Sequence, residues 1–328
     1  MPHQTINYRS YHAMLKLLQA SAPRFRGFDV IVGIPLSGVI PATILASTLG
    51  IPFATLDSAI NRTEPYSGFR SREEFSGWDR SRLLVVDDSV NNGHEIQRVK
   101  ALLDKRGLDA SYLAVFASPA GVVHVDHHLE IVEYPRLFEW NILNHPLAEN
   151  SCYDMDGVLC HDPTDQEKAD DDAYRTFLLN ARPLYVPRYP IGRIVTSRLE
   201  RYRAETEAWL SANGIQYGEL IMMQHVDADT RQRFLLHSLF KADIMKRLPA
   251  WYFVESALTQ ARVIARVSGR PCFSVEGMSM CFPGERGEEG EVVDRLTHLP
   301  AYAPAGPSSN TDGNGLRMRL RTWLRGSR

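Results

Sequence analysis

The sequence predicts an α/β protein of two domains, each built on a mostly parallel sheet flanked by helices. Its 328 residues suffice for two domains of roughly 100–200 residues each. Short β-branched runs alternate with stretches of helical period, which is typical of parallel sheets covered by helices. With 44% hydrophobic and 23% charged residues, the chain can bury two cores. We expect a first domain at 1–148, a second at 149–300, and a flexible linker with a basic tail at 301–328.

Charge and cysteine content narrow the function classes. Lys and Arg total 37 against 39 Asp and Glu, so the broad basic field of a nucleic-acid-binding protein is missing. The four cysteines show no Cys-x-x-Cys spacing, which favours a reducing compartment. The first ten residues lack a signal-peptide pattern, and prolines and glycines interrupt the uncharged stretch 30–56. We therefore expect a cytoplasmic protein with neither nucleic-acid nor membrane partners.

The elements of the first domain follow from apolar periodicity and turn residues. Residues 95–106 place Ile96, Val99, Leu102 and Leu103 on one helical face and stop at Gly107. An Arg-rich span at 57–81 and an aromatic-rich stretch at 134–145 lie between regular elements. The expected order is helix 8–20, strand 29–33, helix 39–49, strand 52–56, strand 82–86, helix 95–106 and strand 111–116.

A motif for binding a phosphorylated sugar occupies residues 83–95. An apolar strand ends in two carboxylates, Asp87 and Asp88, and a small polar turn leads through Gly93 into a helix. Such a turn presents backbone amides and the positive end of the helix dipole to a phosphate, and glycine permits close approach. Adjacent acids can accept hydrogen bonds from vicinal hydroxyls. The ligand indicated is a phosphorylated ribose.

This motif resembles the signature of type I phosphoribosyltransferases, two acids followed by a small phosphate loop. The run Gly33-Ile34-Pro35-Leu36-Ser37-Gly38 resembles the family's pyrophosphate loop, and the span 57–81 stands where its mobile lid lies. The resemblance covers roughly the first 145 residues. It implies transfer of ribosyl 5-phosphate from phosphoribosyl pyrophosphate, with Mg²⁺, to a nucleobase-like acceptor.

The resemblance also implies roles for individual residues. Asp87 and Asp88 would hold the ribose hydroxyls, and Arg62, Arg70 and Arg72 would stabilise the leaving pyrophosphate. The 5-phosphate would be bound by Ser89, Val90, Asn91, Asn92 and Gly93, and the pyrophosphate by Ser37 and Gly38.

Three residues depart from the family pattern. Asn92 and Glu95 replace the two threonines usual in the phosphate loop, and Leu36 stands where a basic residue often faces the pyrophosphate. Lost hydroxyl donors and a carboxylate near a phosphate both lower affinity. The departures keep open an alternative in which the first domain senses a nucleotide or phosphoribosyl pyrophosphate without turning it over.

The second domain alternates in the same way. Expected strands lie at 151–155, 191–196, 219–223, 251–254 and 271–275, and expected helices at 171–180, 200–213, 229–247 and 256–268.

The strand at 151–155 ends in a pair of acids suited to phosphoryl transfer. Asp154 and Asp156 are separated by one residue, and alternate strand residues point the same way, so both carboxylates should face one pocket. One acid can attack phosphorus while the other handles the leaving-group proton. Later strands end at Thr196 and Glu255, and Lys241 lies in a helix.

The order of these residues resembles the four motifs of haloacid-dehalogenase-type phosphatases. The resemblance implies a Rossmann-like fold with Asp154 as nucleophile and Asp156 as general acid and base. It also implies that Thr196 binds the phosphoryl group, that Lys241 stabilises charge, and that Asp154, Asp156 and Glu255 hold Mg²⁺. Only about 40 residues separate the first two motifs, which predicts little or no cap.

The whole chain resembles phosphoribosyltransferase–phosphatase fusions found near bacterial tellurium-resistance and stress gene clusters. This implies a bifunctional enzyme of nucleotide or nucleoside metabolism. The first domain would join a base to ribose 5-phosphate, and the second would hydrolyse a phosphomonoester, with the nucleotide product as one candidate. The alternatives are a phosphatase regulated by an inactive sensing domain, and a scaffold with both sites inactive. By family analogy a homodimer is the candidate assembly, and the tail is expected to be dispensable.

Overall fold

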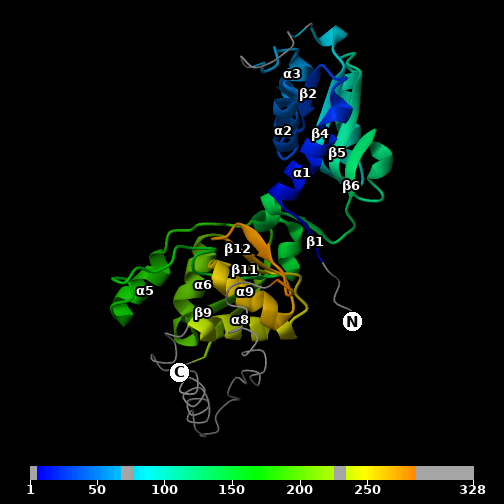
Figure 1. Cartoon of the computed structure of the whole chain (residues 1–328). Coiled ribbons are helices and arrows are strands. Elements are labelled where there is room, and N and C mark those ends of the chain that lie inside the picture. Colours follow the sequence, from blue (N-terminus) through cyan, green and yellow to red (C-terminus); the bar gives the residue numbers. More distant parts are fainter. Residues whose placement is uncertain (1–5, 68–74, 76, 225–233, 286–328) are drawn as a thin grey trace.

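The computed structural model describes residues 6–67, 75, 77–224 and 234–285. Two lobes are visible in Figure 1, each with a sheet covered by helices. The predicted α/β class with mostly parallel sheets is confirmed. None of the helices in these ranges is long and apolar enough to cross a bilayer.

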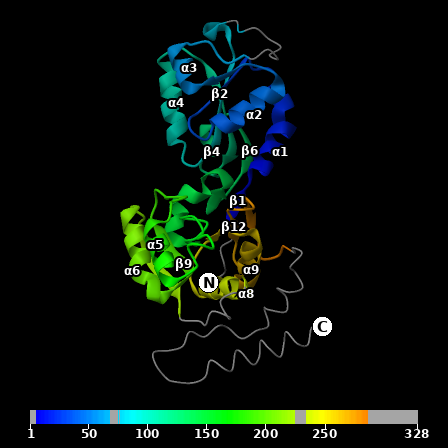
Figure 2. The ribbon, with the colours of Figure 1, turned by 90° about the vertical axis from the view of Figure 1, so that its left-hand side faces the viewer.

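The first lobe contains a five-stranded, wholly parallel sheet in the order β3-β2-β4-β5-β6. In Figure 2, α4 lies on one side of this sheet and α1 and α2 lie on the other. Two apolar clusters cover its faces, one including residues of α1 and α2 and the other residues of α4. The strands are β2 (Val30–Gly33), β3 (Phe53–Thr55), β4 (Leu83–Val90), β5 (Ala110–Ala117) and β6 (His127–Ile131), and the helices are α1 (Tyr11–Ser21), α2 (Val39–Leu49), α3 (Leu56–Asn61) and α4 (His94–Asp104).

β4 is longer than the sequence predicts. The expected strand ends at residue 86, whereas β4 continues through the two acids to Val90. The reason is pairing with β5, because Asp87 lies opposite Ala114 and Val90 opposite Ala117. The acids are therefore held within the sheet ladder.

The second lobe contains a six-stranded sheet in the order β10-β9-β8-β11-β12-β13, in which only β13 runs antiparallel. Its likeness to the haloacid-dehalogenase fold stays a prediction. The strands are β8 (Cys152–Tyr153), β9 (Ile191–Leu199), β10 (Tyr217–Met223), β11 (Phe253–Glu255), β12 (Cys272–Ser274) and β13 (Ser279–Cys281), and the helices are α5 (Asp171–Asn180), α6 (Arg203–Ala212), α8 (Phe234–Arg247) and α9 (Leu258–Ser268).

A small parallel sheet joins the lobes and was not expected from the sequence. β1 (Asn7–Arg9) pairs with β7 (Arg136–Phe138). Ile6 and Leu137 pack in the core of the second lobe, whereas Phe138 packs in the first. The division near residue 148 stays a prediction, and the segment just before it already packs onto the second core.

Several predictions fall outside the described residues. They concern Arg70, Arg72, the start of the helix expected at 229–247, and the linker and tail at 301–328.

Candidate functional site

The first candidate site lies where the order of the first sheet reverses. β2 and β4 are neighbours, but the chain leaves them toward opposite edges, and ligands of open α/β sheets bind in the crevice at such a point. The loop after β2 and the end of β4 meet there. Ser37 Oγ donates a hydrogen bond to Asp88 Oδ1 at 2.7 Å. A Cβ on Gly38 would lie 2.9 Å from Asp87 Oδ1 and 2.6 Å from the Val86 carbonyl oxygen, so only glycine fits there.

The two acids are buried next to each other, so the charge of one disfavours ionisation of the other. Asp87 is 7% and Asp88 5% exposed. Burial, followed by the charge of Asp88, raises the pKa of Asp87 well above its usual value. The buried Arg136 of β7 interacts electrostatically with both acids: burial lowers the pKa of its guanidinium, and the charges of Asp88 and Asp87 oppose that shift. Arg136 was not among the predicted site residues, because it follows the acid pair by almost fifty residues.

The phosphate turn is shorter than predicted. Ser89 and Val90 lie in β4, and the Val90 side chain is buried in the first core. The Val90 carbonyl accepts hydrogen bonds from Arg136 Nη1 and from the Ser118 amide, so we correct its predicted place in the loop. The turn that remains is 91–93, directly before α4.

Gly93 is required in this turn. It has φ 75°, and a Cβ there would meet the His124 ring at 2.2 Å. Asn91 and Asn92 are exposed beside it, at the positive end of α4. The turn can therefore present backbone amides to an anion, as the sequence predicts.

Two predictions about the surrounding loops can be compared with the structure. Arg62 pairs with Asp79 at 2.8 Å and donates to the Arg106 carbonyl, just past the C-terminal end of α4. Arg62 thus contacts the end of α4 that lies away from the phosphate turn, and its predicted contact with the leaving pyrophosphate stays a prediction. Leu36 is 92% exposed and supplies no charge to the loop after β2.

Trp140 contacts the first site and was not predicted to do so. Its indole N–H donates to Asp88 Oδ2 at 2.6 Å, and its ring stacks on Phe138 at 5.0 Å between centroids. The sequence shows an aromatic-rich stretch here, but no spacing rule connects it to an acid 52 residues earlier.

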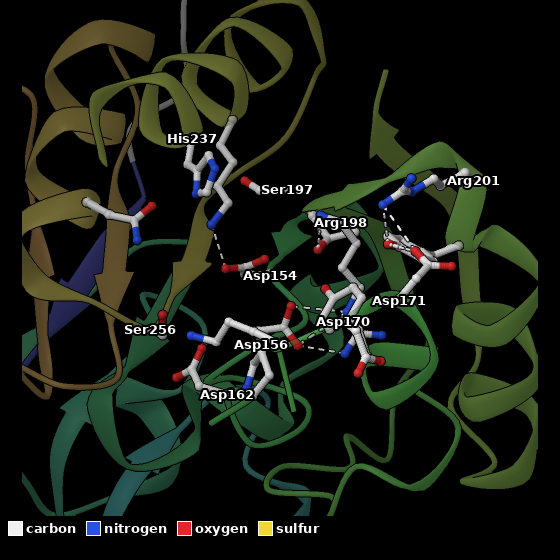
Figure 3. A pocket seen from close by; sticks show the side chains of 17 residues that line it. Asp154, Asp156, Asp162, Asp170, Asp171, Ser197, Arg198, Arg201, His237 and Ser256 are labelled. Carbon is white, nitrogen blue, oxygen red and sulfur yellow. Dashed lines mark hydrogen bonds and ion pairs between the residues drawn. The ribbon is translucent and has the colours of Figure 1, made fainter. Parts of the chain in front are cut away.

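The second candidate site is a cavity of about 570 Å³ in the other lobe (Figure 3). It lies where the order of the second sheet reverses between β8 and β11. All four predicted catalytic residues line this cavity: Asp154, Asp156, Thr196 and Lys241.

Lys241 connects two carboxylates at the base of the cavity. Its Nζ lies 2.5 Å from Asp154 Oδ2 and 2.7 Å from Glu255 Oε2. Burial alone would lower the pKa of Lys241, but the charges of Asp154 and Glu255 outweigh it and raise that pKa. Burial raises the pKa of Asp154 to about 8, although Lys241 opposes the shift. The predicted residues thus form one coupled charge cluster.

Arg198 is one of the residues of the second site that the sequence reasoning missed. Its side chain is 1% exposed, and Nη2 lies 2.6 Å from Asp156 Oδ1, a pairing visible in Figure 3. It also donates to Cys160 Sγ at 3.2 Å. Because Arg198 follows Thr196 by two residues on β9, the alternation rule could have placed both on the same side of the strand.

The acidic side chains supply oxygen donors of the kind that Mg²⁺ takes. Asp162 joins Asp154 and Asp156 in the cavity lining, and burial followed by the charges of Asp156 and Glu255 raises the pKa of Asp162. This excess of carboxylates fits a divalent cation chemically. In the part of the chain that is described, no three such side chains already converge on one metal position. Lys241 pairs with Asp154 and Glu255, and Arg198 pairs with Asp156.

The comparisons with known proteins concern the first lobe. Residues 11–146 match the family described as "Phosphoribosyl transferase domain". The chain is 25% identical over 143 residues to a xanthine-guanine phosphoribosyltransferase from Cereibacter sphaeroides, covering 41% of this chain and 82% of that protein. It is 29% identical over 98 residues to the transcriptional regulator GfcR from Methanothrix thermoacetophila, covering 29% of this chain and about half, 47%, of the regulator.

A solved purine phosphoribosyltransferase from Pyrococcus horikoshii aligns with 40% of this chain and 92% of its own, at 22% identity and a TM-score of 0.33. The family match spans the described sheet from α1 to η5, the 3₁₀ helix Pro146–Asn150. The family match over residues 11–146 identifies the N-terminal region of this chain as a phosphoribosyltransferase domain.

Proposed function

We propose that the N-terminal domain transfers ribose 5-phosphate from phosphoribosyl pyrophosphate to a nucleobase-like acceptor. The observation that carries the proposal is the buried acid pair, Asp87 and Asp88, placed between the loop after β2 and the turn before α4. The similarity to a xanthine-guanine phosphoribosyltransferase favours a purine as the base.

Each part of the first site has a defined task in this reaction. Asp87 and Asp88 accept hydrogen bonds from the ribose hydroxyls, and the turn 91–93 binds the 5-phosphate with its amides. Ser37 and Gly38 hold the pyrophosphate, which gains charge as its bond to C1 of the ribose breaks and a base nitrogen forms the new bond. Bound Mg²⁺ would neutralise part of the pyrophosphate charge.

For the second lobe we propose phosphomonoester hydrolysis through an aspartyl-phosphate. An Asp154 carboxylate oxygen bonds to phosphorus while the ester P–O bond breaks, and Asp156 gives the leaving oxygen its proton. Water then attacks the aspartyl-phosphate, with Asp156 accepting the proton, and releases inorganic phosphate. Thr196 and Lys241 bind the phosphoryl oxygens. Mg²⁺ held by Asp154, Asp156 and Glu255 would lower the repulsion between nucleophile and phosphate.

A second candidate function is a sensing domain that regulates the phosphatase. Leu36 leaves the pyrophosphate loop without a cation, and Glu95 places a carboxylate in the first turn of α4. The similarity to a transcriptional regulator supports this candidate. In that case the first site binds phosphoribosyl pyrophosphate or a nucleotide without breaking a bond.

Release of pyrophosphate by the full chain distinguishes these functions. The assay contains phosphoribosyl pyrophosphate, MgCl₂ and one base at a time from a panel of purines and pyrimidines. Transfer predicts base-dependent release that the Asp88→Asn variant loses, whereas Asp154→Asn keeps it. Binding of phosphoribosyl pyrophosphate without release by any base would contradict transfer and favour the sensing domain.

A further inference from the structure

We propose that Trp140 is a positioning residue of the first site, which fixes the Asp88 carboxylate for the ribose hydroxyls. The identity of the ligand in this inference rests on the proposed function. The inference concerns a residue outside the strand-turn-helix motif, on η4 (Glu139–Asn144), the 3₁₀ helix between the lobes.

The hydrogen bonds around Asp88 show how this positioning works. Ser37 Oγ binds Oδ1 at 2.7 Å, and Trp140 Nε1 binds Oδ2 at 2.6 Å. The two donors come from separate segments, so together they fix the plane of the carboxylate. A carboxylate has about four lone-pair positions, and these two donors use two of them. Trp140 therefore orients Asp88 without occupying its whole accepting capacity.

Trp140 is itself held firmly enough to act in this way. Its ring stacks on Phe138 at an interplanar angle of 11° and on Phe116 at 26°, with centroids 5.0 and 6.1 Å away. The ring of Tyr11 of α1 also packs against it, with the two ring centroids 5.4 Å apart. Such aromatic packing fixes the ring and leaves the N–H as its polar end.

The second lobe anchors the backbone next to Trp140. The Ile142 carbonyl accepts hydrogen bonds from Tyr153 Oη at 3.1 Å and from Tyr252 Oη at 3.3 Å. Tyr153 directly precedes Asp154 in the chain. The orientation of Asp88 in one lobe thus depends on a segment that is attached to the nucleophile strand of the other.

A tryptophan that served only as packing would be replaced well by phenylalanine, which makes Trp140→Phe a sharp test. Phenylalanine keeps the stacked ring but cannot donate to Asp88. Trp78→Phe is the matched control, because Trp78 is a buried tryptophan of the same lobe whose Nε1 has no acceptor among the described residues.

The test is calorimetric binding of Mg²⁺–phosphoribosyl pyrophosphate to the full chain, together with the KM for the same substrate. We expect Trp140→Phe to bind phosphoribosyl pyrophosphate about tenfold more weakly and to have a higher KM for it, with kcat unchanged. The affinity and KM of Trp78→Phe should stay within twofold of the wild-type values. Ligand-induced tryptophan fluorescence change should persist in Trp78→Phe and be lost in Trp140→Phe. Equal binding by Trp140→Phe and the wild type would overturn the proposal.

The experiment distinguishes failure of the proposed transfer reaction from failure of the proposed role of Trp140. Binding without pyrophosphate release would contradict transfer, yet the comparison of the two variants would still decide the role of Trp140. A wild-type chain that does not bind phosphoribosyl pyrophosphate at all would overturn both.

Discussion

The ion pair between Arg198 and Asp156 is the most deeply buried arginine contact of the second cavity. Arg198 is almost fully enclosed, and its guanidinium donates to both carboxylate oxygens of Asp156. A buried pair need not stabilise a protein relative to apolar residues, but removal of one partner leaves the other charge uncompensated. Arg198 therefore controls the position and the charge environment of the proposed acid and base.

We expect Arg198→Met to lower the free energy of unfolding of the second lobe by about 3 kcal/mol. The matched control is Arg201→Met, which breaks an exposed pair with Asp171 and should have a much smaller effect, because water screens such pairs. Urea unfolding at pH 7 measures both. Equal effects of the two substitutions would contradict the burial argument.

The raised pKa of Asp87 should make the free energy of unfolding of the first lobe depend on pH. Its folded-state pKa lies above the unfolded value of 3.8, because of burial and then the charge of Asp88. The folded state then holds a proton that the unfolded state has released, so stability from this group is present at low pH and is lost as pH rises through the folded pKa. Asp87→Asn should flatten this decline, as measured by urea unfolding from pH 5 to 8. Parallel pH profiles for variant and wild type would contradict it.

At the residue scale, the sequence predicts the acids better than their partners. Asp87, Asp88, Asp154 and Lys241 follow from strand ends and motif order, and the structure brings them into two sites. Trp140 and Arg136 could not be found in this way. The hydrogen bond of Trp140 to Asp88 and the electrostatic interaction of Arg136 with both acids arise only when distant segments fold together.

Elements with strong periodicity or clear stop residues are the ones that the sequence locates well. α2 has the bounds expected from its apolar run, which ends at Gly50 in the left-handed conformation. β4 extends beyond its expected end because pairing with β5 outweighs the low strand propensity of Asp87 and Asp88. β1 and β7 have three residues each, and their pairing across more than 120 residues leaves no local signal.

Protonation of His145, the residue directly before η5, should destabilise the protein in acid. Its Nδ1 accepts a hydrogen bond from the Leu147 amide, and burial followed by the charge of Arg136 lowers the pKa of His145 to about 4. A neutral folded-state histidine contributes stability above pH 6.5 that is lost as pH falls toward 4.

We expect the wild type to lose about 1 kcal/mol more than His145→Asn between pH 7 and pH 5, after allowance for partial exposure. Asparagine keeps a side-chain acceptor for the helix start but does not titrate. Thermal unfolding at the two pH values measures the difference. Identical losses in the two proteins would show that His145 is charged or unimportant in the folded state.

At the scale of the whole molecule, the N-terminal segment contributes to both lobes. A division of the sequence into two consecutive domains does not predict this. Ile6 lies near the N-terminus yet packs in the core of the second lobe. The following helix, α1, belongs to the first lobe through Met14 and Leu18. A residue of the second core therefore precedes, in the sequence, the first residues of the first core.

Ile6→Ala should destabilise the second lobe by about 2–4 kcal/mol, because it leaves a cavity in that core. Hydrogen exchange should speed up at the amides of β8 and β11 and stay unchanged in β2 and β5. Met14→Ala is the reciprocal control, with faster exchange in the first sheet. Faster exchange in the first sheet of Ile6→Ala would contradict the shared packing.

The central claim is that Asp87 and Asp88 form the ribose site of a phosphoribosyltransferase domain. Calorimetric titration of the full chain with Mg²⁺–phosphoribosyl pyrophosphate tests it directly, with the Asp87→Asn, Asp88→Asn double variant beside the wild type. Hydrogen bonds to charged groups contribute roughly 1.5–3 kcal/mol each, so the double variant should bind at least about 100-fold more weakly. Asp104→Asn, Asp109→Asn removes two exposed charges of the same lobe and should bind as the wild type does. Unchanged affinity in the Asp87→Asn, Asp88→Asn variant would contradict the account.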